Sequence, residues 1–283
     1  MLLLGKPVAE KILSETKDKI TTSGIVPGRG AVLVGDDPAS RVYVGIKESR
    51  AGELGFHFVK MELSPSATES EILGVIRKLN QDEKIHGIIV QLPLPLGINA
   101  DRVIAAIDPG KDADGFLGAD GRTPVFPEAI IELAKSSGAP LSGKSGVVLV
   151  NSERFGKMMG NALRREGMSV EYVFPDDMGA SRSMISRSDF VFTALGRPET
   201  ISRNMFKKDA VVIDGGIAKR DGKIVGDISG ERDDADIFLS PVPGGVGPVT
   251  VADLAEEFDL SADAAERVAH LYAVSGGSAH DDA

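Results

Sequence analysis

Tyr43 and Lys47 are the two residues whose types and spacing first suggest chemistry. They stand four residues apart in the segment SRVYVGIKESRAGELGF, residues 40–56, and a helix there would place both side chains on one face, one turn apart. A phenol beside an ammonium on a rigid element can orient the amine for proton transfer. Because the pattern Y-x-x-x-K is frequent by chance, the alternative is a solvated helix face with Tyr43 half buried.

Three other segments carry polar or glycine-rich patterns next to apolar runs. Gln91 follows the apolar segment Gly87–Val90, where its amide can pair with a heterocycle or cap the loop backbone. Asp112 and Asp114 point opposite ways if the loop KDADGF is extended, so one can face a ligand while the other forms an Asx-turn. In the run PVPGGVGP, residues 241–248, the paired glycines allow a backbone to approach a flat ligand closely.

The composition excludes several classes of protein. The 283 residues carry a net charge of −10, which argues against nucleic acid or an anionic membrane as a partner. Since neither a membrane-length apolar run nor a secretory signal is visible, we expect a cytoplasmic protein. With no cysteine and only four scattered histidines, no metal site is expected. Acid–base chemistry must come from Lys, Tyr, Asp or Glu.

Hydrophobic periodicity predicts an α/β protein with two successive α/β domains, residues 1–138 and 139–251, followed by helices from Val251 onward. In the first domain we expect Ser40 to cap the helix that carries Tyr43 and Lys47, and Thr68 to open another helix with a capping box. Parallel sheets place their sites at the carboxyl ends of the strands, here in a cleft between the domains.

Taken in order, Y-x-x-x-K, IIVQLPLP, KDADGF and SPVPGGVGPVT resemble the bifunctional methylenetetrahydrofolate dehydrogenase/methenyltetrahydrofolate cyclohydrolase family, from residue 3 to about residue 255. The resemblance implies a folate-site domain, a Rossmann-type NAD(P)-binding domain, C-terminal helices in 252–283 that pack back on the first domain, and a homodimer. It also implies an activity in one-carbon metabolism. Methylenetetrahydrofolate is oxidised to methenyltetrahydrofolate with NADP, and the product is hydrolysed to 10-formyltetrahydrofolate.

The same resemblance assigns roles to individual residues. Lys47 is then the catalytic base and acid, Tyr43 lines the pterin site and orients the lysine, and Gln91 supports the lysine. Asp114 binds the amine nitrogens of the pterin. The remaining substrate-binding residues that it implies are Leu92, Pro243 and Gly244.

The chain departs from the family pattern at the cofactor. Asn151 stands where the family has the arginine that recognises the 2′-phosphate of NADP. Asp176 follows Gly156 at the spacing of a carboxylate that accepts the ribose 2′-hydroxyl and repels a 2′-phosphate. NADP is therefore the family expectation and NAD the alternative. The predicted cofactor-binding residues are Asn151, Ser152, Gly156, Asp176, Gly196 and Ile217.

Val125 and Phe126 replace smaller family residues and are expected to fill part of a nicotinamide site. Three hypotheses follow: a working bifunctional enzyme, a cyclohydrolase whose dehydrogenase is weakened or lost, and a folate-binding paralogue without turnover. A generic amino-acid or shikimate-type dehydrogenase shares the two-domain plan, but it does not account for IIVQLPLP or PVPGGVGP.

Overall fold

The computed structural model describes residues 1–118, 123–229 and 236–256. The chain forms two compact units. One contains Leu13–Ala113, and the other contains Met1–Ile12 together with Asp114–Leu254. The mixed α/β class with parallel sheets is as predicted. Most of the segment 252–283 lies outside the described residues.

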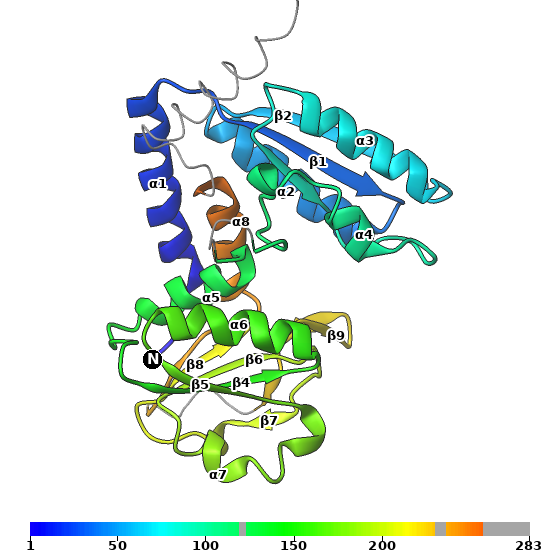
Figure 1. The fold of residues 1–283 in the computed structure, drawn as a ribbon. Coiled ribbons are helices and arrows are strands. Elements are labelled where there is room, and N and C mark those ends of the chain that lie inside the picture. Colours follow the sequence, from blue (N-terminus) through cyan, green and yellow to red (C-terminus); the bar gives the residue numbers. More distant parts are fainter. Residues whose placement is uncertain (119–122, 230–235, 257–283) are drawn as a thin grey trace, which may run out of the picture. The chain divides into compact units, whose positions relative to one another are not determined.

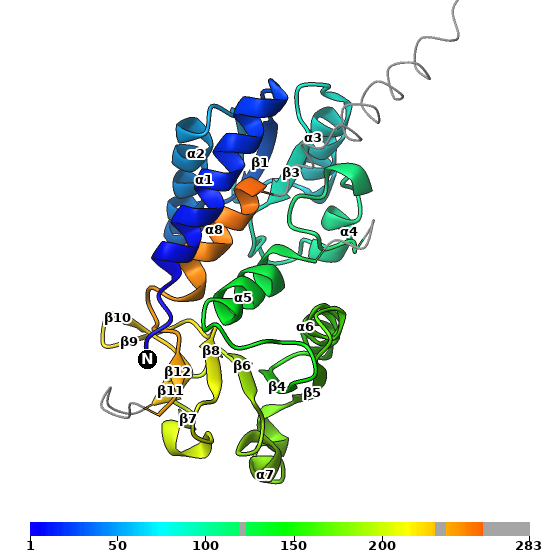
Figure 2. The same ribbon diagram turned by 90° about the vertical axis from the view of Figure 1, so that its left-hand side faces the viewer.

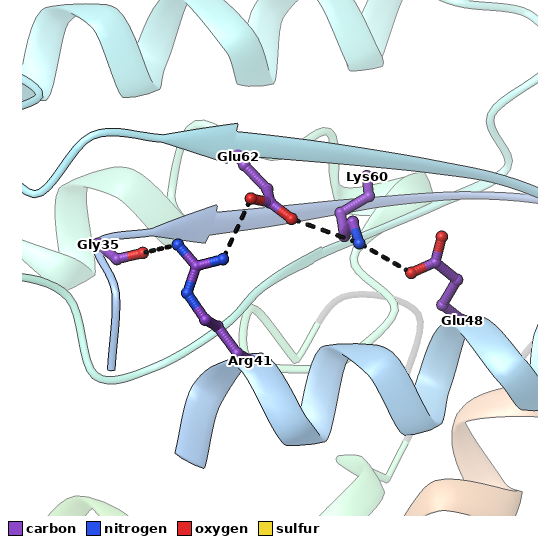
Figure 3. A network of polar contacts seen from close by, with 5 residues as sticks. All are labelled: Gly35, Arg41, Glu48, Lys60 and Glu62. Atoms are coloured by element: carbon purple, nitrogen blue, oxygen red, sulfur yellow. Dashed lines mark hydrogen bonds and ion pairs between the residues drawn. The ribbon is translucent and has the colours of Figure 1, made fainter. Parts of the chain in front are cut away.

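The unit Leu13–Ala113 is built on a three-stranded parallel sheet in the order β2-β1-β3. Two helices connect the strands, and Figure 3 shows them on opposite faces of the sheet, as right-handed crossovers in this order require. The last part of α1 lies beside α2 (Figure 2), where Leu13 and Ile20 pack against Ala51 and Leu54. The elements are α1 (Gly5–Ser23), β1 (Gly28–Val34), α2 (Pro38–Glu53), β2 (His57–Leu63), α3 (Glu69–Gln81), β3 (Gly87–Val90), α4 (Ala100–Ile104) and η1 (Pro109–Lys111).

The helix starts in this unit follow local rules, with one correction. Thr68 forms the predicted capping box with Glu71 at the start of α3. The prediction of Ser40 as the cap of α2 is wrong, because Asp37 caps this helix and its carboxylate accepts the N–H of Ser40 at 2.8 Å. Pro38 explains the difference, since proline fits the first helical position and moves the cap to the residue before it.

The other unit is built on a five-stranded parallel sheet in the order β12-β8-β6-β4-β5. Figure 1 shows α5 and α6 together above this sheet. In the sequence, Asp221 and Gly222 predict the turn of a hairpin over Lys219–Val225, and the structure confirms it as the antiparallel pair β9 and β10. The elements are α5 (Val125–Lys135), β4 (Ser145–Val150), α6 (Glu153–Arg165), β5 (Ser169–Val173), η3 (Pro175–Asp177), α7 (Arg182–Ile185), β6 (Phe190–Ala194), β7 (Ile201–Ser202), η4 (Arg203–Met205), β8 (Val211–Asp214), β9 (Ala218–Arg220), β10 (Lys223–Val225), β11 (Ile228–Ser229), β12 (Phe238–Leu239) and α8 (Val246–Glu256).

The units divide the chain between Ala113 and Asp114, earlier than the boundary near residue 138 that the sequence predicts. The reason is tertiary packing, because α5 lies against α6 and β8. The first residues of the chain also belong to this unit. The N–H of Leu3 donates to the carbonyl of Leu239 in β12 at 2.9 Å, and Leu239 donates in turn to the carbonyl of Met1 at 2.9 Å. None of the helices in the described ranges is long and apolar enough to cross a membrane.

Candidate active site

Helix α2 has buried residues on its inner side and a chain of exposed charges on its outer side. Val44 is 1% exposed and faces the core. On the outside, Arg41 pairs with Glu62 of β2 at 3.3 Å, and Lys60 contacts both Glu62 at 3.3 Å and Glu48 of α2 at 3.0 Å (Figure 3). The hydrogen bond to Glu48 raises the pKa of Lys60, and the bond from Lys60 lowers the pKa of Glu62. The burial of Val44 sets the rotation of α2 about its own axis.

That rotation presents Tyr43 and Lys47 on the side of α2 away from the charge chain. The expected helix is present, so the two side chains lie one turn apart. Tyr43 is 39% exposed, and Lys47 is half buried. The Nζ of Lys47 donates to Oε1 of Gln91, just after β3, at 3.3 Å. The structure thus joins two motifs that are 44 residues apart.

The orientation of Gln91 is set by a second hydrogen bond. Its Nε2 donates to the carbonyl of Leu92 at 2.7 Å, which leaves Oε1 to face Lys47. Both ends of the amide therefore have partners within the chain. An acceptor at this place holds an ammonium in a defined position.

Lys111, in the loop KDADGF, has a structural role that the sequence analysis missed. Its ammonium donates to the carbonyls of Leu79, Asn80 and Asp82 at 3.3, 2.7 and 2.9 Å. Those carbonyls lie at the end of α3, where backbone acceptors have no partner within the helix. Burial lowers the pKa of Lys111.

The two aspartates of this loop differ in burial, as their alternation suggests. Asp112 is 4% exposed and forms a parallel bridge with Ile88 of β3. Asp114 is half buried and opens the other unit, where its carbonyl accepts the N–H of Val125 at 3.4 Å. Asp114 is therefore the more accessible of the two carboxylates.

The predicted folate-pocket residues Pro243 and Gly244 lie in the loop before α8. Pro243 is exposed, and Gly244 has a φ of +105°, which favours glycine. The carbonyl of Gly244 accepts the N–H of Gly5 at 2.8 Å, and a side chain on Gly5 would overlap the carbonyl of Gly245. The glycine run thus has a packing reason, because the start of α1 lies against it.

The predicted cofactor residues gather at the carboxyl edge of the five-stranded sheet. Asn151 follows β4, and its Nδ2 donates to the carbonyl of Leu195, which follows β6, at 3.2 Å. Ser152 caps α6 by accepting the N–H of Phe155 at 3.4 Å. A Cβ on Gly156 would lie 2.9 Å from the ring of Tyr172, so glycine lets α6 pack closely on β5.

The other three predicted cofactor residues are solvent-exposed. Asp176 lies in η3 after β5, Gly196 follows β6 with a φ of +64°, and Ile217 follows β8 with 53% of its surface exposed. Strand order reverses at β4, since β5 lies on one side of it and β6, β8 and β12 on the other. Dinucleotides bind at such a reversal point, outside the carboxyl ends of the strands, so the residues present fit one.

Phe126 also lies at this edge. Its ring packs against Phe155 in the first turn of α6, with ring centroids 5.5 Å apart, and a Cβ on Gly215 would come within 2.8 Å of it. Val125 is buried. The ring of Phe126 therefore occupies space beside the ends of β4 and β8.

The described residues contain no group of three His, Asp or Glu side chains placed to hold a metal ion.

Comparison with known proteins identifies relatives over nearly the whole chain. A model of the tetrahydrofolate dehydrogenase/cyclohydrolase catalytic domain matches residues 3–114, and a model of the NAD(P)-binding domain of the same family matches residues 124–266. The bifunctional protein FolD of Campylobacter concisus is 38% identical over 277 residues, which cover 93% of this chain and 98% of that protein.

Solved structures agree with these matches. The bifunctional FolD enzyme of Campylobacter jejuni superposes with a TM-score of 0.84 at 34% identity, covering 90% of this chain and 96% of that one. The Trypanosoma brucei enzyme, solved with NADP and an inhibitor, gives a TM-score of 0.82 at 28% identity, covering 98% and 99%.

Proposed function

Because this chain belongs to the tetrahydrofolate dehydrogenase/cyclohydrolase family, we propose that it oxidises 5,10-methylenetetrahydrofolate and hydrolyses the methenyl product to 10-formyltetrahydrofolate. The hydrogen bond from Lys47 to Gln91 is the observation that supports this proposal most directly. It holds the amine of the first motif beside the amide of the second, on a helix and at the end of a strand.

The residues act as follows in this proposal. A bound nicotinamide nucleotide supplies the acceptor for the hydride of the first step. In the second step water adds to the cationic methenyl carbon and loses a proton, which Lys47 in its neutral form accepts. The bond between that carbon and N5 then breaks as the remaining hydroxyl proton passes to N5, which gives the 10-formyl product. Gln91 holds the Nζ of Lys47, and Tyr43 orients it from one turn earlier on α2. Asp114 anchors the aminopyrimidine through a charge-assisted hydrogen bond, and Leu92, Pro243 and Gly244 line the substrate.

The test of the lysine is the hydrolysis of methenyltetrahydrofolate without nucleotide, followed by its near-ultraviolet absorbance. Lys47→Met keeps the aliphatic stem and removes the amine, so we expect the rate to fall by a factor of about 10²–10⁴. Lys78→Met is the matched control, because Lys78 is exposed in the last turn of α3. If Lys47→Met hydrolysed methenyltetrahydrofolate at the native rate, Lys47 would have no part in the mechanism.

For the nucleotide we propose that Asp176 and Asn151 decide the preference. NADP is the family's nucleotide, but Asp176 puts an exposed carboxylate after β5, where a dinucleotide fold recognises the ribose 2′ position. The amide of Asn151 is engaged with the carbonyl of Leu195 and brings no positive charge. Both features favour NAD. The test compares kcat/KM for NAD and NADP, and Asp176→Asn should shift the ratio toward NADP. An unchanged ratio would exclude Asp176 as the determinant.

We also propose a cytoplasmic homodimer, which the family resemblance implies. Light scattering of the purified protein tests the dimer, since a single mass near 29.8 kDa would contradict it.

A further inference from the structure

Two aspartates that the proposed chemistry does not use are buried at the carboxyl edge of the five-stranded sheet. Asp227 is 0% exposed and Asp214 is 4% exposed. Buried carboxylates are costly unless hydrogen bonds compensate them. Asp214 ends β8, and the β9–β10 hairpin returns the chain so that Asp227 follows β10. Neither residue belongs to the motifs that the sequence predicts to form a site.

Asp227 holds the loop that follows β6. Its Oδ2 accepts the hydroxyl of Thr193 at 2.6 Å and the N–H of Leu195 at 2.7 Å, while its Oδ1 accepts the N–H of Arg197 at 2.8 Å. The two backbone donors flank Gly196, one of the exposed residues predicted to contact the nucleotide. One buried carboxylate therefore sets the backbone on both sides of Gly196.

Asp214 holds the loop that follows β8. Its Oδ1 accepts the N–H groups of Gly216 at 3.0 Å and Asp227 at 3.2 Å, and its Oδ2 accepts the N–H of Ile228 at 3.0 Å. Gly216 precedes the exposed Ile217, the other predicted contact. The N–H of Asp214 in turn donates to Oγ of Ser240 after β12 at 2.7 Å.

The packing around the pair allows little adjustment. A side chain on Gly216 would overlap the carboxylate of Asp227, and one on Gly226 would overlap the carboxylate of Asp214. Through the bond from Asn151 to Leu195, the network also reaches the residue that follows β4. One continuous set of hydrogen bonds thus connects the ends of β4, β6, β8 and β12.

We propose that Asp227 and Asp214 are positioning residues for the nicotinamide nucleotide, which fix the loops that present Gly196 and Ile217. The ligand meets the exposed residues, and the buried carboxylates hold the backbone beneath them. The inference rests on the proposed function, because it requires that the native protein uses a nucleotide. It adds residues that act through the backbone and touch neither substrate nor nucleotide.

Asp227→Asn tests the proposal with little change of volume. The new amide keeps one oxygen as an acceptor, but its NH₂ group replaces the other oxygen. That NH₂ group then faces the backbone N–H of either Arg197 or Leu195, so two donors oppose each other. We expect the KM for the nucleotide to rise by about tenfold or more, since hydrogen bonds to a charged acceptor are lost. Nucleotide-free hydrolysis of methenyltetrahydrofolate should keep its native rate. Because the chain has no tryptophan, binding can be measured directly from the fluorescence of the reduced nucleotide.

Thr193→Val is the second variant, in case Asp227→Asn does not fold, because it removes one donor at nearly constant shape. It should raise the same KM by a smaller factor. Asp221→Asn makes the same chemical change at the exposed hairpin turn and should leave both activities unchanged.

The outcomes separate the two proposals. If the native protein forms no reduced nucleotide with NAD or NADP, both the dehydrogenase and the positioning role fail. If the native protein is active but folded Asp227→Asn has an unchanged KM for the nucleotide, the positioning role alone is overturned. Where Asp227→Asn does not fold, an unchanged KM in Thr193→Val has the same meaning. Equal loss of both activities in a folded variant would likewise overturn it, since that is the result of a general structural defect.

Discussion

Asp214 should make the protein less stable as the pH rises from about 4 to about 7. Burial, together with the charge of Asp227, raises the pKa of Asp214 from 3.8 to about 6, although the N–H groups of Asp227 and Ile228 oppose the rise. The folded protein therefore holds the neutral form more tightly than the unfolded chain does. Stabilisation from this group is complete below pH 3.8 and is lost as the pH rises through 6.

The size of the effect follows from the difference in pKa. A rise from 3.8 to about 6 is about 2 units, and each unit corresponds to 1.36 kcal/mol, which gives about 3 kcal/mol. The side chain is 4% exposed, so solvent screens little of this energy. Asp189 affects stability at lower pH and in the opposite direction, because the hydrogen bond from Lys207 lowers the pKa of Asp189 to about 2. Measurements kept at or above pH 4 therefore exclude most of its titration.

The assay is urea unfolding, followed by circular dichroism, of the native protein and of Asp214→Asn between about pH 4 and pH 7.5. The asparagine is neutral throughout, and any cost of its N–H facing the N–H of Ile228 is independent of pH. The free energy of unfolding of the native protein, minus that of the variant, should fall by about 2.5 kcal/mol across this range, because part of the roughly 3 kcal/mol is already lost at pH 4. Asp221→Asn serves as the exposed control. A difference for Asp214→Asn that stays flat, or that rises with pH, would refute the reasoning.

Three further substitutions test the packing that positions the two sites, each by urea unfolding at neutral pH. Lys111→Met leaves three carbonyls at the end of α3 without their charged donor and should cost about 2 kcal/mol; a loss below 0.5 kcal/mol, on the order of an ordinary surface change, would contradict this role. Gly156→Ala pushes a methyl group against the ring of Tyr172 and should cost about 1–3 kcal/mol, despite the better helix propensity of alanine. Arg41→Ala removes an exposed ion pair with Glu62 and should cost less than about 1 kcal/mol, with the cost shrinking further in high salt.

Features that depend on a few neighbouring residues could be predicted from the sequence. The capping box at Thr68, the hairpin at Asp221 and Gly222, and the helix that carries Tyr43 and Lys47 each follow from local rules and are confirmed. The predicted cap of α2, Ser40, lies three residues after the observed cap, Asp37, because Pro38 prefers the first helical position.

Features that depend on packing between distant segments could not be predicted. The division of the chain before α5 follows from contacts with α6 and β8, which no local pattern reveals. Lys111 lies in a recognisable loop, but its three acceptors belong to the end of another helix. The signal for Asp214 was visible as a carboxylate that ends an apolar strand before two glycines. Its partner Asp227 lies beyond a hairpin, so only the fold shows that both are buried together.

The two predicted sites are held by separate sets of hydrogen bonds, one in each unit, and this separates the two activities. Lys47 is held by a side-chain hydrogen bond between α2 and the end of β3, on regular elements of one unit. The nucleotide loops are held by Asp214 and Asp227 in the other unit, and the two hydrogen-bonded sets share no residue. Oxidation needs both the folate and the nucleotide in place, whereas hydrolysis needs only the folate and a proton acceptor. Disturbing the buried carboxylates should therefore weaken oxidation and spare hydrolysis, while removing the amine of Lys47 should slow hydrolysis by the factor given above without changing the affinity for the nucleotide.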